Sequence, residues 1–266
     1  CQKDPLIDLV RNQLGCNPVL RPSTQHKPLD LLHVRVGKTQ NIGQVAGYLK
    51  ESFDFPPGAL KPDKVIDFSG KDSSQVKLDF GLQLLSRLAG TSPAKEDLWK
   101  THFTGKEQVS FQFHEVEAVS ADLALLRDML LHNRVSADDP VFSEKNWLGQ
   151  PQNQFFVITK TIISPRFSVK FGNNGGFQVS PQFKNDLAGA NLSIADNSSI
   201  ALLLEHRSDV PLTFAFVCHQ IKIAEDGKIY PLIETGKVPP LTFGATSRPT
   251  GGAVLLTDSP VMLDIR

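Results

Sequence analysis

A strict alternation of apolar and polar residues is the feature that most constrains how this chain folds. Between residues 75 and 84, every second residue is apolar and the residues between are polar or glycine. Successive side chains of a strand point to opposite faces, so this pattern predicts a strand of about ten residues with one apolar face. Residues 155–163 and 167–171 show a related periodicity and predict further strands. The side chains expected on these faces are Val76, Leu78, Phe80, Leu82, Leu84, Phe155, Val157, Ile163, Phe167, Val169 and Phe171.

Most other segments also indicate strands. We expect them at residues 17–20, 29–36, 108–114, 199–205 and 212–219, with a loop at 21–24 and a hairpin turn at Asp226-Gly227. Apolar spacing predicts helices at residues 5–14 and 41–48, and a third that Ser120 caps and that places Leu131 inward. Strands therefore dominate, and we expect an α+β fold with a twisted, mainly antiparallel central sheet and surrounding short helices.

The sequence contains no motif of a familiar catalytic or metal site. Its seven histidines lack metal-ligand spacing, and there is neither a Gly-x-Ser-x-Gly elbow nor a phosphate-binding Gly-x-x-x-x-Gly-Lys-[Ser/Thr] loop. We therefore expect no enzyme, no metal and no cofactor. The 28 basic and 28 acidic residues cancel, which argues against a nucleic-acid-binding protein. Seven basic and three acidic residues among the first fifty suit an anionic membrane surface, or an ordinary solvated one.

The three cysteines, Cys1, Cys16 and Cys218, cannot all pair with one another, which favours a reducing compartment. Cys1 opens the chain, and loss of either a signal or an initiator Met would leave such a cysteine. A cysteine in this place is suited to acylation, or it is a free thiol at a frayed end. No run approaches the roughly 18 consecutive apolar residues of a transmembrane helix.

The last part of the chain has the composition of a linker followed by an apolar tail. Pro239-Pro240 ends the preceding strand, and residues 242–252 suit an exposed, cleavable loop. The residues of interest in this loop are Thr242, Phe243, Gly244, Arg248, Gly251 and Gly252. Residues 253–266 follow with the apolar side chains of Val254, Leu255, Leu256, Val261 and Leu263. This tail either docks on the sheet and blocks lateral pairing, or completes the core as a final strand.

Several segments resemble bacterial gasdermins. Residues 17–22, Asn-Pro-Val-Leu-Arg-Pro, and 27–32, Lys-Pro-Leu-Asp-Leu-Leu, are similar to the start of that family, where a cysteine-led helix precedes a strand, an Arg-containing loop and a Pro-Leu-x-Leu-Leu stretch. The opening Cys-Gln-Lys-Asp-Pro looks like the family's cysteine followed closely by Asp-Pro. Residues 211–216, Pro-Leu-Thr-Phe-Ala-Phe, and the turn at Asp226-Gly227 resemble a late strand and its acidic turn.

The resemblance implies a dormant, lipidated protein of bacterial antiviral defence. It implies a gasdermin-like pore-forming domain at residues 1–241, a cleavable linker at 242–252 and an autoinhibitory peptide at 253–266. An activating protease would remove the peptide. The protein, a cytoplasmic monomer until then, would bind membrane lipids, form a homo-oligomer in the inner membrane, open a large β-barrel pore and kill the cell. The family's cysteine carries a palmitoyl group, and Cys1 is the matching position.

The strand pattern agrees with a membrane-crossing role. A membrane strand needs about 9–11 residues, which residues 76–84 and 155–163 supply, and strands cross lipid only as a closed barrel. One chain offers too few such strands, so an oligomer is required. The same alternation also describes one buried face of an ordinary sheet. Two other classes therefore stay open, a lipoprotein-type binding module anchored through Cys1 and an α+β interaction domain.

Overall fold

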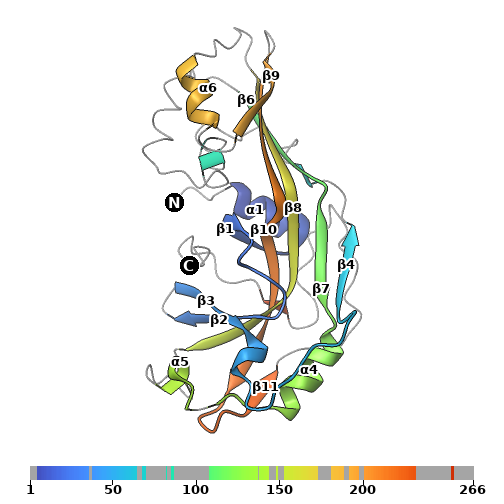
Figure 1. The fold of residues 1–266 in the computed structure, drawn as a ribbon, viewed down its shortest axis with the longest axis vertical. Helices are drawn as coiled ribbons and strands as arrows, with labels where there is room; N and C mark the ends of the chain where they lie inside the picture. The colour runs from blue at the N-terminus through green and yellow to red at the C-terminus, as the bar shows by residue number, and fades with distance from the viewer. Residues whose placement is uncertain are drawn as a thin grey trace. The chain divides into compact units, whose positions relative to one another are not determined.

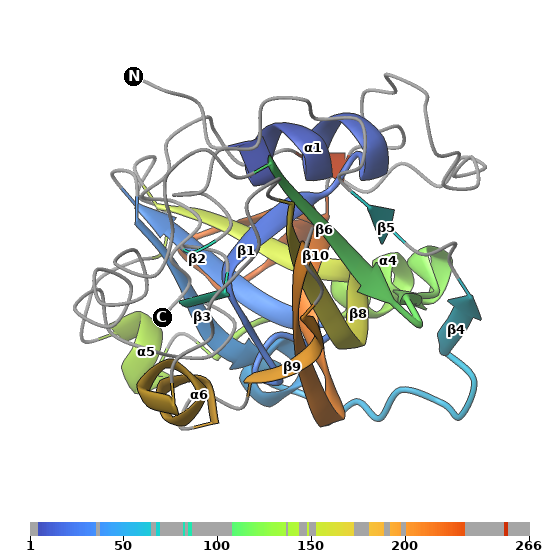
Figure 2. The same cartoon turned by 90° about the horizontal axis from the view of Figure 1, so that it is seen from above.

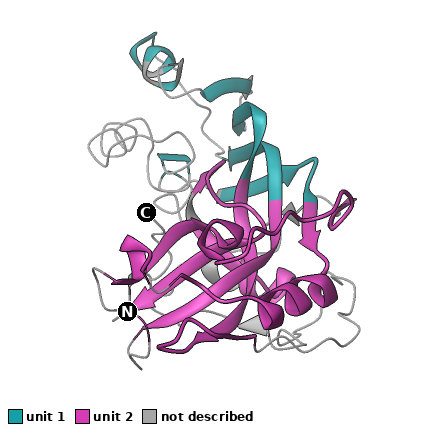
Figure 3. Ribbon diagram, turned by 60° about the horizontal axis from the view of Figure 1, so that its bottom comes forward, with its two compact units in different colours: residues 1–5, 64–117, 163–212 teal, residues 6–63, 118–162, 213–266 magenta. Residues whose placement is uncertain are grey.

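Long antiparallel strands dominate the computed structural model of the chain (Figure 1; seen from above in Figure 2). The structure describes residues 5–35, 38–64, 68–69, 82, 85–86, 108–136, 138–143, 148, 153–172, 181–188, 192–197, 201–231 and 253–254. The chain divides into two units (Figure 3). Unit 1 comprises residues 1–5, 64–117 and 163–212, and unit 2 comprises residues 6–63, 118–162 and 213–266.

Unit 2 is built on a sheet with the strand order β1-β10-β8-β2-β3. These strands are β1 (Asn17–Ser23), β2 (Asp30–Arg35), β3 (Lys38–Gln44), β8 (Gln154–Gly172) and β10 (Ala201–Ile223). The two longest strands, β8 and β10, contribute residues to both units. Strand β7 (Glu117–Ala121) pairs with β8 and with β4 (Leu60–Lys64), and β11 (Ile229–Pro231) forms an antiparallel hairpin with β10. The antiparallel sheet predicted from the alternation is therefore present.

The helices of unit 2 are short. They are α1 (Pro5–Leu14), the 3-10 helix η1 (Val45–Tyr48), α4 (Leu123–His132) and α5 (Pro140–Ser143). Helix α4 begins after Asp122, whose Oδ1 accepts hydrogen bonds from the backbone N–H of Ala124 at 3.1 Å and Leu125 at 3.2 Å. The predicted Ser120 cap is thus wrong, because Ser120 lies within β7. The inward position predicted for Leu131 is also wrong, since Leu131 is 40% exposed.

The core of unit 2 lies on both faces of the sheet. One cluster includes Leu31 and Val157, which pack with residues of α4 and β11, and the other includes Leu32 and Ile158. Neighbours in sequence thus belong to different clusters, because successive side chains of a strand point to opposite faces. This double burial explains why residues 155–158 are all apolar rather than alternating.

Within the described residues, unit 1 contains three short strands, parts of the two longest strands and one helix, besides the helical residues Leu82, Leu85 and Ser86. The strands and the helix are β5 (Phe68–Ser69), β6 (Gln108–His114), residues 163–172 of β8, α6 (Pro181–Ala188), β9 (Leu192–Asn197) and residues 201–212 of β10. Strand β6 pairs antiparallel with β8, with Phe111 opposite Val169 and Phe113 opposite Phe167. Strand β9 pairs antiparallel with β10. Neither α6 nor β9 was predicted from the sequence.

Several predicted boundaries differ from the structure. Residues 41–44 belong to strand β3 rather than to a helix, because they pair with β2, and only Val45–Tyr48 is helical. Residues 21–23, expected in a loop, continue β1. Strand β8 and strand β10 each run unbroken where two segments were expected. Leu82 is buried in a helical turn, so the strand predicted there is wrong at that residue, and residues 75–81 and 83–84 lie outside the described part of the chain.

Candidate functional site

One edge of β10 in unit 2 is covered by three separate pieces of chain. Strand β1 pairs with residues 213–216, and β11 pairs with residues 221–223. The two residues of β12 (Ala253–Val254) pair antiparallel between them, with Val254 opposite Cys218 and Ala253 opposite His219. Strand β8 is the neighbour of β10 on its other side. Residues 217–220 of β10, which we call the edge gap, are thus closed by a segment from the far end of the sequence.

Side chains fix the backbone of the edge gap from the β8 side. The hydroxyl of Thr159 donates a hydrogen bond to the carbonyl oxygen of Val217 at 3.3 Å, and its oxygen lies 2.9 Å from Nδ1 of His219. His219 is 2% exposed, and Cys218 on the opposite face is fully buried with its Sγ 3.8 Å from Nδ2 of Asn17. Burial raises the pKa of the Cys218 thiol, so it stays protonated. The gap is therefore a fixed edge that presents its backbone to one further strand.

The sheet of unit 1 has one strongly apolar face. Phe113 and Phe167 face each other across β6 and β8 with ring centroids 4.7 Å apart, and Phe111 packs edge-on against Phe113 at 6.3 Å. Val109, Val169 and Phe171 continue this surface. All of these residues are at most 5% exposed. The predicted alternation of β6 and of the second half of β8 therefore produces a continuous aromatic face.

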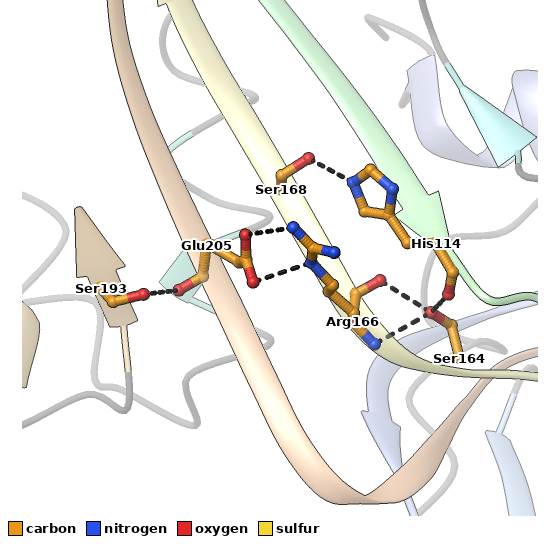
Figure 4. A network of polar contacts seen from close by, with 6 residues as sticks. All are labelled: His114, Ser164, Arg166, Ser168, Ser193 and Glu205. Atoms are coloured by element: carbon orange, nitrogen blue, oxygen red, sulfur yellow. Dashed lines mark hydrogen bonds and ion pairs between the residues drawn. The ribbon is translucent and has the colours of Figure 1, made fainter. Parts of the chain in front are cut away.

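The opposite face of unit 1 carries a polar network (Figure 4). The Nη2 of Arg166 on β8 donates to Oε2 of Glu205 on β10 at 2.8 Å, and its Nε lies 2.8 Å from Oε1. His114 Nε2 lies 2.9 Å from Ser168 Oγ. Ser164 Oγ donates to the carbonyl oxygen of His114 at 2.6 Å and accepts from the backbone N–H of Arg166 at 3.2 Å. These contacts join strands β6, β8 and β10 on the side away from the aromatic rings.

The predicted membrane residues do not all lie in one place. Phe155 and Val157 belong to the core of unit 2, whereas Ile163 and the aromatic-face residues Phe167, Val169 and Phe171 lie in unit 1. Val254 of the predicted tail pairs with β10. The other predicted site residues lie outside the described part of the chain. They are Cys1, Val76, Leu78, Phe80, Leu84, Thr242, Phe243, Gly244, Arg248, Gly251, Gly252, Leu255, Leu256, Val261 and Leu263.

Sequence reasoning missed two features of these sites. It did not identify Cys218 and His219 as the partners of the tail, because nothing local marks which strand a distant segment will join. It also missed the pair of Arg166 and Glu205. The polar residues Arg166, Ser168 and Lys170 alternate with the predicted apolar ones, so their common face was a signal within reach.

Among the residues that the structure describes, no group of three His, Cys, Asp or Glu side chains could hold a metal ion. No helix within the described ranges has the length and apolar character needed to span a membrane.

Comparison with known proteins gives consistent matches. The model of the Bacterial Gasdermin Family matches residues 19–228. A gasdermin from a Vitiosangium strain is 24% identical over 229 residues, covering 85% of this chain and 84% of that protein. A gasdermin from Lysobacter enzymogenes is 26% identical over 275 aligned positions, covering 99% of this chain and 95% of that protein. A solved bacterial gasdermin from Bradyrhizobium tropiciagri has a TM-score of 0.56 at 13% identity, covering 87% of this chain and 91% of that chain, which confirms the predicted fold.

Proposed function

This chain belongs to the bacterial gasdermin family of pore-forming proteins, and from that premise we propose that it is held inactive by its own C-terminal segment until a protease removes it. Gasdermins oligomerise into membrane pores and are not enzymes. The family assignment thus confirms the expectation of a non-enzymatic protein. The proposal concerns how this particular chain is kept inactive, how it is released, and which residues enter the membrane.

The observation that carries the proposal is the pairing of β12 with the edge gap of β10. Residues 253–266 act as the inhibitory peptide, and residues 242–252, from Thr242 to Gly252, are the region that the protease cuts. While the peptide is attached, its local concentration is high, so a short pairing is enough to keep it docked. In the described part of the chain the pairing spans two residues, and a backbone hydrogen bond contributes only about 0.5–1.5 kcal/mol net, so we expect the peptide to be lost by dilution once it has been cut free. Cutting then exposes an unpaired strand edge.

Unit 1 is the part that we expect to enter the membrane. It consists mainly of two chain segments, residues 64–117 and 163–212, each of which leaves unit 2 and returns to it. The aromatic face on β6 and β8 then meets lipid, through Phe167, Val169 and Phe171 among others. Ile163 begins the second segment. Phe155 and Val157 lie in the core of unit 2, so we no longer include them among the residues that enter the membrane.

The first segment must also change its structure if it is to cross the bilayer. Leu82, Leu85 and Ser86 are helical here, whereas a membrane strand must be extended and paired. We therefore propose that Leu82 changes from helix to strand on insertion, within the membrane strand expected at residues 76–84 with Val76, Leu78, Phe80 and Leu84. A single chain supplies few strands, so the barrel closes only in an oligomer.

The remaining parts of the proposal follow the family. Cys1 carries a palmitoyl group that adds membrane affinity, since one acyl chain alone gives only marginal binding. The inactive monomer is cytoplasmic, the pore forms in the inner membrane, and the outcome is cell death in antiviral defence. Intact mass measurement of protein from its native host tests the acyl group, which adds a fixed mass that Cys1→Ala removes.

Leakage from liposomes tests the central claim. A recognition site for a specific protease replaces part of residues 242–252, and dye release is followed before and after cutting. A control variant carries the same site in the exposed turn at residues 56–58, where a cut leaves β12 attached. We expect leakage and rings on liposomes only when residues 253–266 are freed, and toxicity of a chain ending near Arg248. Intact protein that leaks as fast as cut protein would refute autoinhibition, and folded cut protein that never leaks would favour a binding module.

A further inference from the structure

The polar face of the unit 1 sheet has a defined charge pattern. On β8, Arg166, Ser168 and Lys170 alternate with the buried Phe167 and Val169, so they point away from the aromatic face. On β10, Glu205 and Arg207 alternate with the buried residues Leu204 and His206 in the same way. The contact of Arg166 with Glu205 places these two sets on one side of the sheet. Unit 1 is therefore already a two-faced sheet, aromatic on one side and charged on the other.

We propose that Arg166 and Glu205 face the lumen of the pore, where their opposite charges cancel, so that the balance between them determines which ions pass. This inference rests on the proposed function, and adds to it the residues that determine which ions pass. A strand that crosses lipid turns its apolar side to the acyl chains and its polar side to water, so the aromatic face fixes the orientation of the other face. Rings of charged side chains in a lumen select ions by sign.

The two charges are expected to keep each other neutral in the open pore. β8 and β10 are neighbouring strands. The ion pair joins one residue on each of them, Arg166 and Glu205, which are 39 positions apart in the sequence. The Glu205 side chain is 12% exposed and that of Arg166 is 35% exposed, and two contacts of 2.8 Å join them. Each subunit of the oligomer contributes one such pair. Removing one partner therefore leaves one uncompensated charge per subunit, repeated around the ring.

Lys170 provides a second probe of the same face. It is exposed in the inactive protein, so Lys170→Gln removes a positive charge without disturbing packing. Lys222 and Glu225, both exposed, lie in unit 2 and supply matched controls of each sign. If the polar face lines the lumen, only charges of unit 1 affect the ions that pass.

The experiment measures the reversal potential of cut protein in planar bilayers under a KCl gradient. Glu205→Gln should shift it toward the anion equilibrium potential, and both Arg166→Gln and Lys170→Gln should shift it toward the cation equilibrium potential. The exchanged pair, Arg166→Glu with Glu205→Arg, should behave as the parent. Lys222→Gln and Glu225→Gln should change nothing. The shifts should be largest near 0.01 M salt, where the screening length is about 30 Å, and vanish at 1 M, where it is about 3 Å.

The outcomes separate this inference from the function on which it rests. Parent protein that never leaks after cutting refutes the proposed function itself. Pores of Glu205→Gln and Lys170→Gln with the parent's reversal potential refute the lumen assignment and leave the pore intact. If Arg166→Gln fails to fold, Glu205→Gln and Lys170→Gln still decide the question.

Discussion

Replacing Gly227 with alanine isolates one close backbone contact. Gly227 has a φ of +80° in the turn between β10 and β11, and its carbonyl oxygen accepts a hydrogen bond from the backbone N–H of Val135 at 2.9 Å. A Cβ on residue 227 would lie 2.3 Å from the carbonyl oxygen of Val135, closer than real Cβ atoms approach. Because the clashing atom is backbone, either the turn or the chain at Val135 must move.

A matched glycine separates this clash from the backbone conformation. Gly58 has a φ of +85°, and a Cβ there would meet nothing within 4 Å. Gly58→Ala should therefore lower the free energy of unfolding only by the cost of a left-handed conformation for alanine, roughly 1–2 kcal/mol. Gly227→Ala carries the same cost plus the clash, for which overpacking suggests about 1–3 kcal/mol more. Gly47, which has open space and no positive φ, should tolerate alanine without loss of stability.

Urea unfolding of the intact chain measures these differences. The three alanine variants and the parent are compared by linear extrapolation, with the slope of the unfolding free energy against urea checked for constancy. We expect the free energy of unfolding to fall in the order parent, Gly58→Ala, Gly227→Ala, with the last two separated by about 1–3 kcal/mol. Equal values for the Gly58 and Gly227 variants would refute the argument from the Val135 carbonyl.

Three further measurements test other described residues. Asp122→Ala removes the cap of α4 and should lower the free energy of unfolding by about 0.5–2 kcal/mol in urea, while Asp122→Asn should retain most of it. Burial lowers the pKa of His26, so below about pH 6.5 the unfolded chain binds a proton at this residue more readily than the folded chain does. The free energy of unfolding should therefore fall as the pH drops, and His26→Gln should make it less dependent on pH. Burial raises the pKa of Cys16 to about 12 and raises that of Cys218 as well. In a Cys1→Ser variant, a thiol reagent at pH 8 should therefore label neither cysteine until denaturant is added. Rapid labelling of the native protein would contradict their burial.

Local sequence patterns predict the strands and helices whose apolar residues recur at regular spacing. Strand β6 and the second half of β8 follow from alternation, and α4 follows from helical spacing. The cap of α4 was placed at Ser120 because serine and aspartate both suit a cap, and only the pairing of β7 shows that the strand continues to Ala121. The sequence predicts a helix at residues 41–44 because local spacing does not reveal their pairing with β2, in which Asp30 lies opposite Gln44.

Long-range pairing decided the sites and could not be derived locally. The apolar residues at 253–256 predict a tail that packs against the protein, but any free strand edge would accept them. The choice of Cys218 and His219 depends on where β1 ends and where β11 begins along β10. Likewise, Arg166 and Glu205 become partners only because β8 and β10 are neighbours in the sheet.

The order in which the chain is synthesised determines when the edge gap can be closed. On a translating ribosome, β1, β10 and β11 are all made before residues 253–254, so for an interval every new chain contains residues 217–220 without the segment that pairs with them. At about 5–20 residues per second, synthesis of residues 232–252 takes roughly one to four seconds. Chains growing on the same messenger are close to one another during that time. Slow codons in this stretch would lengthen the interval, so the rate of translation here sets how long each nascent chain exists before residues 253–254 can pair with the edge gap.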